Sequence, residues 1–197
     1  MKACIVFAHE GDHSFNHEIL ARVKKSCEAA NIQYVIRDLY EMNFQPVFTA
    51  LDMKRIEHRN PSSDIEEEQS LITESDILIM IYPVWWWSPP AILKGYLDRV
   101  FTNGFAFRYE EDGPVGILRN KRAFVFTTTR ESAKEMAEKG LDLVVRKQIV
   151  EGTLEMIGYE VEYQNFTAVT SVEEEGRELM LRLVEQKINS IRQPIPL

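Results

Sequence analysis

The stretch Ile77-Leu78-Ile79-Met80-Ile81-Tyr82 is apolar at every position. A strand with one solvated face alternates apolar and polar residues, so this unbroken run predicts a strand that is covered on both faces. On either side of it, other β-branched runs alternate with stretches of helical periodicity. With this central run, the predicted strands span residues 2–8, 33–38, 77–82, 122–128 and 160–166.

Helix-start residues and helical periodicity occupy the gaps between these strands. Ser14 stands where the N-cap of a helix belongs, and apolar residues follow it at fourfold spacing. Ser63 with Glu66, and Ser171 with Glu174, have the spacing of capping boxes. One predicted helix follows Ser14. Others span residues 51–59, 63–73, 88–101 and 132–157, the last with an interruption near Gly140, and a final helix follows Ser171.

The alternation of strands and helices predicts an α/β fold, a doubly wound five-stranded parallel sheet with helices on both faces. The sequence contains no internal repeat, so we expect residues 1–197 to form a single domain. Ligands of such sheets bind outside the carboxyl ends of the strands, where the strand order reverses. The loops that reach this edge are residues 9–16, 82–90 and 127–132.

Composition excludes several classes of protein. The 197 residues carry a net charge of −8, which argues against nucleic acid as a partner because phosphate binding needs a basic face. The longest apolar run is short and is interrupted by proline, and the N-terminus lacks the pattern of a signal peptide, so we expect a cytoplasmic protein without membrane insertion. Cys4 and Cys27 are expected to be reduced thiols. Neither CxxC nor HExxH occurs, so no metal site is predicted.

The first and third loops carry polar side chains. Residues 9–16 enter a helix N-terminus, where backbone amides and the helix dipole favour a phosphate. The loop matches neither common glycine-rich nucleotide motif, so neutral hydroxyl and amide groups would hold that phosphate. The alternative is that Ser14 only caps the helix. Residues 127–132 add three threonines and one arginine, a weak signal on its own.

The second loop contains three consecutive tryptophans, Trp85-Trp86-Trp87. Side chains of an extended segment alternate between its two sides, so at least one of these rings must line a cavity, an interface or solvent. Aromatic faces at this edge of the sheet can stack on a planar heterocycle. The alternative is that the rings only cover the sheet edge.

Together these motifs resemble the NAD(P)H:quinone oxidoreductase branch of the flavodoxin-like flavoproteins. The resemblance extends over nearly the whole chain, and the block from Pro83 to Phe101 is its most specific part. The matching segments are His9 with Ser14-Phe15-Asn16, Asp38–Pro46, Tyr82-Pro83-Val84, Trp86-Trp87, Pro90–Tyr96, Asp98–Phe101, Gly104–Phe107 and Ile157–Tyr159.

The resemblance implies a homodimer with one flavin per subunit, FAD or FMN, with FAD favoured by Gln69 and the Ser-Phe-Asn loop. The flavin-contacting residues that it implies are His9, Ser14, Phe15, Asn16, Gln69, Pro83, Val84, Trp86, Trp87, Thr127, Thr128 and Thr129, with Arg177 near the adenine end of FAD. The substrate-contacting residues that it implies are Trp86, Trp87, Phe107 and Tyr109, the last two reaching the partner subunit's site.

The activity implied is a two-step, ping-pong transfer. A hydride passes from the co-substrate NAD(P)H to the flavin, and then to a quinone-like acceptor in the same pocket. Other readings are a reductase of nitro or azo compounds, a flavoprotein regulatory or binding subunit with weak turnover, and a one-electron carrier. The long aromatic loop and the extra segment 44–64 argue against the carrier, which needs an exposed flavin edge.

The chain departs from the family after its paired threonines. The family has Gly-Gly there, followed by a Tyr and a His that assist proton transfer, whereas this chain has Thr129-Arg130. All four histidines lie in the first third of the sequence, so no histidine replaces that pair. One hypothesis is that Arg130 points at the flavin pyrimidine edge and stabilises the anionic reduced flavin. The alternative is a solvated or surface-paired arginine.

Overall fold

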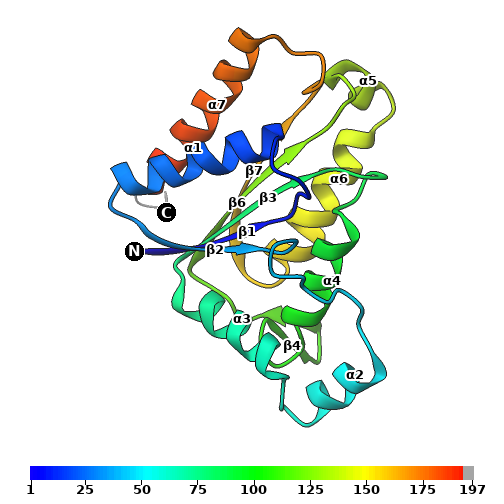
Figure 1. Ribbon diagram of the computed structural model, residues 1–197. Coiled ribbons are helices and arrows are strands. Elements are labelled where there is room, and N and C mark those ends of the chain that lie inside the picture. The colour runs from blue at the N-terminus through cyan, green and yellow to red at the C-terminus, as the bar shows by residue number, and fades with distance from the viewer. Residues whose placement is uncertain (193–197) are drawn as a thin grey trace.

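A computed structural model describes residues 1–192, so residues 193–197 of the predicted domain lie outside it. Five parallel strands form one sheet in the order β2-β1-β3-β6-β7 (Figure 1). Their bounds are β1 Lys2–Phe7, β2 Gln33–Asp38, β3 Ile77–Pro83, β6 Lys121–Thr128 and β7 Tyr159–Phe166. This architecture confirms the predicted fold class. The order reverses between β1 and β3, because β2 lies on one side of β1 and every later strand lies on the other.

Helices cover both faces of the sheet (Figure 1). On one face, α1 (Phe15–Ala29) packs against α7 (Glu174–Asn189). The opposite face is covered by α3 (Ser63–Glu74), α4 (Ala91–Val100) and α6 (Leu141–Ile149). The remaining elements are α2 (Ala50–Glu57), β4 (Phe107–Glu110), β5 (Gly113–Gly116), α5 (Ala133–Glu138), the π-helix η1 (Val150–Glu155) and the short 3-10 helix η2 (Ser190–Arg192).

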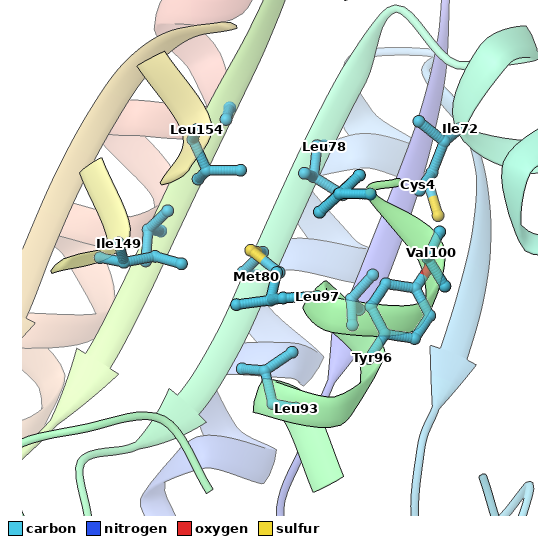
Figure 2. Packing of buried hydrophobic residues seen from close by; sticks show 14 of the residues in the cluster. Cys4, Ile72, Leu78, Met80, Leu93, Tyr96, Leu97, Val100, Ile149 and Leu154 are labelled. Carbon is cyan, nitrogen blue, oxygen red and sulfur yellow. The ribbon is translucent and has the colours of Figure 1, made fainter. Parts of the chain in front are cut away.

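The central strand β3 is buried at all seven positions, as its unbroken apolar run predicts. Its alternate side chains enter two separate cores. Figure 2 shows one of them, where Leu78 and Met80 of β3 face Tyr96 and Leu97 of α4, with Ile149 of α6 nearby. The odd-numbered residues of β3 pack instead with α1 and α7. Because both faces are covered, the ends of the strands are the part of the sheet that is left open to a ligand.

The two predicted capping boxes are wrong. Ser62, rather than Ser63, is the N-cap of α3, and no side-chain hydrogen bond caps that helix. The N-cap of α7 is Glu173, because the chain makes a tight turn in which the Ser171 amide donates to the Ala168 carbonyl before the helix starts. Capping boxes do form at Thr49 with Asp52, and at Ser132 with Glu135.

Two further features refine the predicted elements. The loop region after α4 contains an antiparallel hairpin of β4 and β5, in which Phe107 pairs with Gly116. The hairpin was not predicted, because its Gly- and Pro-rich sequence is typical of a loop. α4 itself begins at Ala91, so the prolines before it precede the helix rather than occupy its first turn. The predicted interruption at Gly140 is confirmed, since this residue has a φ of 65° between α5 and α6.

Both cysteines are free, as expected, and both are buried. Burial raises the pKa of the Cys4 thiol to about 12 and that of Cys27 to about 11, because a thiolate is poorly solvated inside the protein. A thiol with so high a pKa is inert as a nucleophile at neutral pH. Neither cysteine therefore contributes redox chemistry to the site described below.

The substitution Gly95→Ala is expected to destabilise the protein. A Cβ at this position in α4 overlaps the backbone of Pro46, which cannot move as a side-chain end can. The overlap costs about 2 kcal/mol, more than the roughly 1 kcal/mol that alanine gains in helix propensity. Urea unfolding measures the difference. The control is Gly176→Ala in α7, where the added Cβ would lie 2.5 Å from Val172 Cγ1. This atom is the end of a side chain that can rotate away, so a smaller loss of stability is expected than for Gly95→Ala. An equally stable Gly95→Ala protein contradicts the close approach.

Candidate functional site

The three loops meet at the carboxyl ends of β1, β3 and β6, and there they surround a cavity of about 860 Å³, which we call the strand-end cavity. Most of the site residues predicted from the sequence line it. They are His9, Ser14, Phe15, Asn16, Pro83, Val84, Trp86, Trp87, Thr128, Thr129, Arg130 and Arg177. The cavity lies beside the point between β1 and β3 where the strand order reverses, as doubly wound sheets predict.

One wall of the strand-end cavity is the N-terminus of α1. Ser14 is the N-cap, and its hydroxyl accepts from the His17 backbone amide and lies 2.9 Å from His17 Nδ1. The Asn16 side chain donates to Thr128 Oγ1 at 3.0 Å, so it joins the first loop to the third. In the part of the chain that is described, His9 Nδ1 and Asn16 Oδ1 are buried without a hydrogen-bond partner. Such atoms fit a wall built for a polar ligand.

His9 follows β1 and is half-buried. Burial is the main cause that lowers its pKa below the ordinary value, since it disfavours the charged imidazolium. The neighbouring His17 ring, 5.5 Å away between centroids, acts in the same direction. His9 therefore offers the cavity a neutral ring near pH 7.

The tryptophan loop is a two-residue hairpin turn. Trp85 and Ser88 exchange backbone hydrogen bonds of 2.9 and 3.0 Å, while Trp86 and Trp87 have φ values of 50° and 60°. Positive φ at both central residues is the signature of a type I′ turn, which normally holds Asn-Gly. The Trp86 side chain is 95% exposed yet lines the cavity. Bulky residues held in a left-handed conformation at an exposed turn indicate a constraint imposed by function.

The third loop divides its threonines between the cavity wall and the interior. Thr127 is fully buried and does not line the cavity. Its hydroxyl donates to Asn165 Oδ1 at 3.0 Å and lies 3.0 Å from the Tyr163 hydroxyl. Asn165 in turn donates to Thr129 Oγ1 at 3.3 Å. Thr127 thus belongs to a polar network beneath the cavity that orders this loop.

Sequence reasoning missed Tyr163 and Asn165. A usable signal was present, because polar residues interrupt a strand that must pair with the threonine-bearing one. The register places Thr127 opposite Asn165 and Val125 opposite Tyr163. Without that register, the partners of the threonines could not be assigned.

The two arginines of the strand-end cavity differ in their surroundings. The Arg177 guanidinium lies 5.1 Å from the centroid of the Phe15 ring and pairs with Glu18. It is therefore anchored to the start of α1. Arg130 is exposed, and within residues 1–192 it makes no hydrogen bond or ion pair.

Besides Thr127, three predicted site residues lie outside the strand-end cavity. Gln69 donates to the Val100 carbonyl at 2.9 Å and to Thr102 Oγ1 at 3.2 Å, beside a separate cavity of about 190 Å³. Phe107 and Tyr109 lie on the β4–β5 hairpin, where they line another cavity of about 850 Å³. Within one chain, the fold does not bring these three residues to the flavin site that the sequence predicts.

Neither a metal centre nor a membrane span is found in the described part of the chain. Residues 1–192 contain no group of three His, Cys, Asp or Glu side chains that could hold a metal ion. Among the same residues, no helix is long and apolar enough to cross a bilayer.

Comparison with known proteins identifies the family. A family model described as the flavodoxin-like fold matches residues 1–188. The chain belongs to this flavodoxin-like family. Among its members, an uncharacterized NAD(P)H oxidoreductase of Haemophilus influenzae is 33% identical over 189 residues, which cover 95% of this chain and 94% of the relative. The ribosyldihydronicotinamide dehydrogenase [quinone] of Mus musculus is 30% identical over 217 residues, covering 100% and 94%.

A solved structure of the flavodoxin-like family agrees with these relatives. The NAD(P)H:quinone oxidoreductase from Methanothermobacter marburgensis superposes with a TM-score of 0.89 at 26% identity, covering 100% of this chain and 99% of that one. The resemblance to NAD(P)H quinone oxidoreductases, first drawn from the residues around Pro83–Phe101, is thereby confirmed.

Proposed function

We propose that this protein is a flavin-dependent NAD(P)H oxidoreductase that reduces a quinone-like acceptor by a two-step, ping-pong mechanism. The observation that carries the proposal is the strand-end cavity, which joins a capped helix N-terminus to a tryptophan-bearing turn. The first suits a phosphate and the second a planar ring. The relatives named as NAD(P)H and quinone oxidoreductases support the same reaction class.

The residues present fit a flavin. The Ser14 hydroxyl and the first amides of α1 would hold its phosphate, with His9 and Asn16 completing the polar wall. Pro83, Val84 and the two turn tryptophans would line the ring. A flavin bound there would supply the redox chemistry, taking a hydride from NAD(P)H and giving it to the acceptor. The chain's own part is to orient the two substrates in turn against the same aromatic turn.

FAD is favoured over FMN by Arg177, which lines the strand-end cavity and is anchored to the start of α1, because the resemblance places this residue near the adenine end of the longer cofactor. An acceptor of the nitro or azo class remains a second candidate, because an aromatic turn stacks on any planar electrophile. A regulatory flavoprotein with weak turnover is a third candidate, favoured by Thr129-Arg130 in place of the family's Gly-Gly and by the missing Tyr and His.

We also propose that the protein acts as a homodimer of single flavin-binding domains in the cytoplasm. Tyr109 is 69% exposed and lies with Phe107 on a hairpin remote from its own strand-end cavity. In a homodimer these rings could complete the partner subunit's site. Sedimentation equilibrium tests the dimer.

The two buried free thiols suit a reducing compartment such as the cytoplasm.

The test of the proposed function begins with the purified protein. We expect it to be yellow and to release FAD on denaturation, which chromatography distinguishes from FMN. Anaerobic NADH or NADPH is expected to bleach the flavin band near ~450 nm, and a quinone to restore it. A protein that takes up neither flavin contradicts the proposal. Slow bleaching with unaltered flavin content favours the regulatory alternative.

A further inference from the structure

The residues on either side of Arg130 are held by backbone hydrogen bonds, while its own side chain has no partner within residues 1–192. On one side, the Thr129 amide donates to the Phe166 carbonyl at 2.8 Å. On the other, the Ala168 amide donates to the Glu131 carbonyl at 2.9 Å. The end of β7 and the segment that follows it therefore fix the chain before and after Arg130. From this position Arg130 lines the strand-end cavity.

The Arg130 loop adjoins the tryptophan turn. The Val84 amide donates to the Thr128 carbonyl at 2.9 Å, which continues the β3–β6 ladder to the edge where both loops begin. Arg130 and the two turn tryptophans line the same cavity, on loops that this hydrogen bond joins. A planar molecule stacked on Trp86 or Trp87 would therefore occupy a cavity that Arg130 also lines.

Two arginines line the strand-end cavity. Arg177 is paired with Glu18, whereas no carboxylate within residues 1–192 neutralises the charge of Arg130. A guanidinium presents a planar fork of donors that matches carboxylate, sulfonate and phosphate groups. Glu131 lines the same cavity, and its negative charge partly opposes an anion there. Removing the charge of Glu131 is therefore expected to have the opposite effect to removing that of Arg130.

We propose that Arg130 is a specificity-determining residue that binds an anionic substituent on the planar electron acceptor. The inference rests on the proposed function and names its substrate class, which is an aromatic acceptor bearing a carboxylate or sulfonate. Because the acceptor ring is small, its anionic substituent lies close to the stacked face, within the length of one arginine side chain. The phosphates of NAD(P)H, by contrast, are separated from the nicotinamide by a ribose, so Arg130 serves the acceptor rather than the donor.

The experiment compares two acceptors with the holoenzyme, 1,4-naphthoquinone and 1,4-naphthoquinone-2-sulfonate. In Arg130→Gln, the ratio of kcat/KM for the sulfonate to kcat/KM for the neutral quinone is expected to fall about fivefold to tenfold, the loss of one charge-assisted hydrogen-bonded contact. Arg130→Lys retains part of the ratio. Glu131→Gln raises it. The intrinsic reactivities of the two quinones cancel, because each variant is compared with the unaltered protein.

A second measurement does not depend on turnover. Equilibrium dialysis of 2-naphthalenesulfonate, which cannot be reduced, is expected to give a Kd weaker by the same factor in Arg130→Gln. Lys134→Gln is the control, since it removes one exposed cation from α5, outside the cavity lining, and leaves both the ratio and the Kd unchanged.

Three results would overturn the proposal: equal losses with both quinones, a loss confined to kcat/KM for NAD(P)H, or an unchanged Kd. Equal losses would instead support a role for Arg130 at the flavin itself. A protein without flavin or turnover contradicts the proposed function, while the dialysis measurement still decides whether Arg130 binds the anion.

Discussion

Replacing Arg37 with leucine is expected to lower the free energy of unfolding by about 3–5 kcal/mol. Arg37 on β2 donates from Nε to Glu68 Oε1 at 2.9 Å, and its Nη2 also pairs with this carboxylate. Glu68 on α3 is 1% exposed, and the Tyr96 hydroxyl donates to it at 3.0 Å. Without Arg37, the Glu68 carboxylate keeps one hydrogen-bond donor among the described residues, the neutral Tyr96 hydroxyl. The variant must then expose the buried carboxylate to water or protonate it.

The state of Arg37 itself agrees with this reasoning. Burial alone lowers the pKa of a guanidinium, yet the pKa of Arg37 is raised, because the hydrogen bonds and charge of Glu68 outweigh that effect. The interaction is therefore mutual. It ties the edge strand β2 to α3 on the face of the sheet shown in Figure 2.

Urea unfolding at pH 7 measures the loss, and two further variants test its cause. Arg37→Leu combined with Glu68→Gln is expected to recover at least half of the stability, because the amide keeps an acceptor for Tyr96 without a buried charge. Lys94→Leu breaks an exposed pair with Asp98 and is expected to cost about 0.5 kcal/mol or less. Equal losses in the Arg37 and Lys94 variants would show that burial of Glu68 does not govern the effect.

The fold could be predicted because burial on both faces leaves a simple record in the sequence. The run 77–82 has no polar position, and a parallel sheet with helices on both faces is what makes such a run necessary. Boundaries set by single hydrogen bonds were harder. The pattern Ser171-x-x-Glu174 is right for a capping box, yet the turn at Ala168 delays the helix. Only the backbone conformation at the N-cap decides whether Ser171 or Glu173 precedes the helix.

The candidate site was predictable to the extent that it is built from loops at the ends of neighbouring strands. Strand order brings His9, Pro83 and Thr128 to one edge, whatever the details of their loops. Residues whose placement depends on packing were not predictable in the same way. Gln69 faces Val100 and Thr102 because of how α3 lies on α4, and no local pattern encodes that contact.

The double substitution Trp86→Asn with Trp87→Gly is expected to stabilise the apoprotein while it weakens flavin binding about 100-fold. Both positions have positive φ, where a bulky residue costs about 1–2 kcal/mol and Asn-Gly costs little. Trp86 is almost fully exposed, so its removal loses little packing. The apoprotein is therefore expected to gain about 1–2 kcal/mol. Losing roughly 100 Å² of aromatic contact weakens the flavin complex by about 2.5 kcal/mol, close to 100-fold in Kd.

Thermal unfolding of the apoprotein and fluorescence titration with FAD measure the two effects separately. The control is Arg59→Gly, which relieves another positive φ, 51°, at a position that does not line the strand-end cavity. It is expected to raise stability without changing the Kd for FAD. A turn variant that binds FAD normally would mean that the tryptophan faces do not contact the cofactor. A less stable variant would mean that the rings support the fold, and strain at this turn would then need no functional explanation.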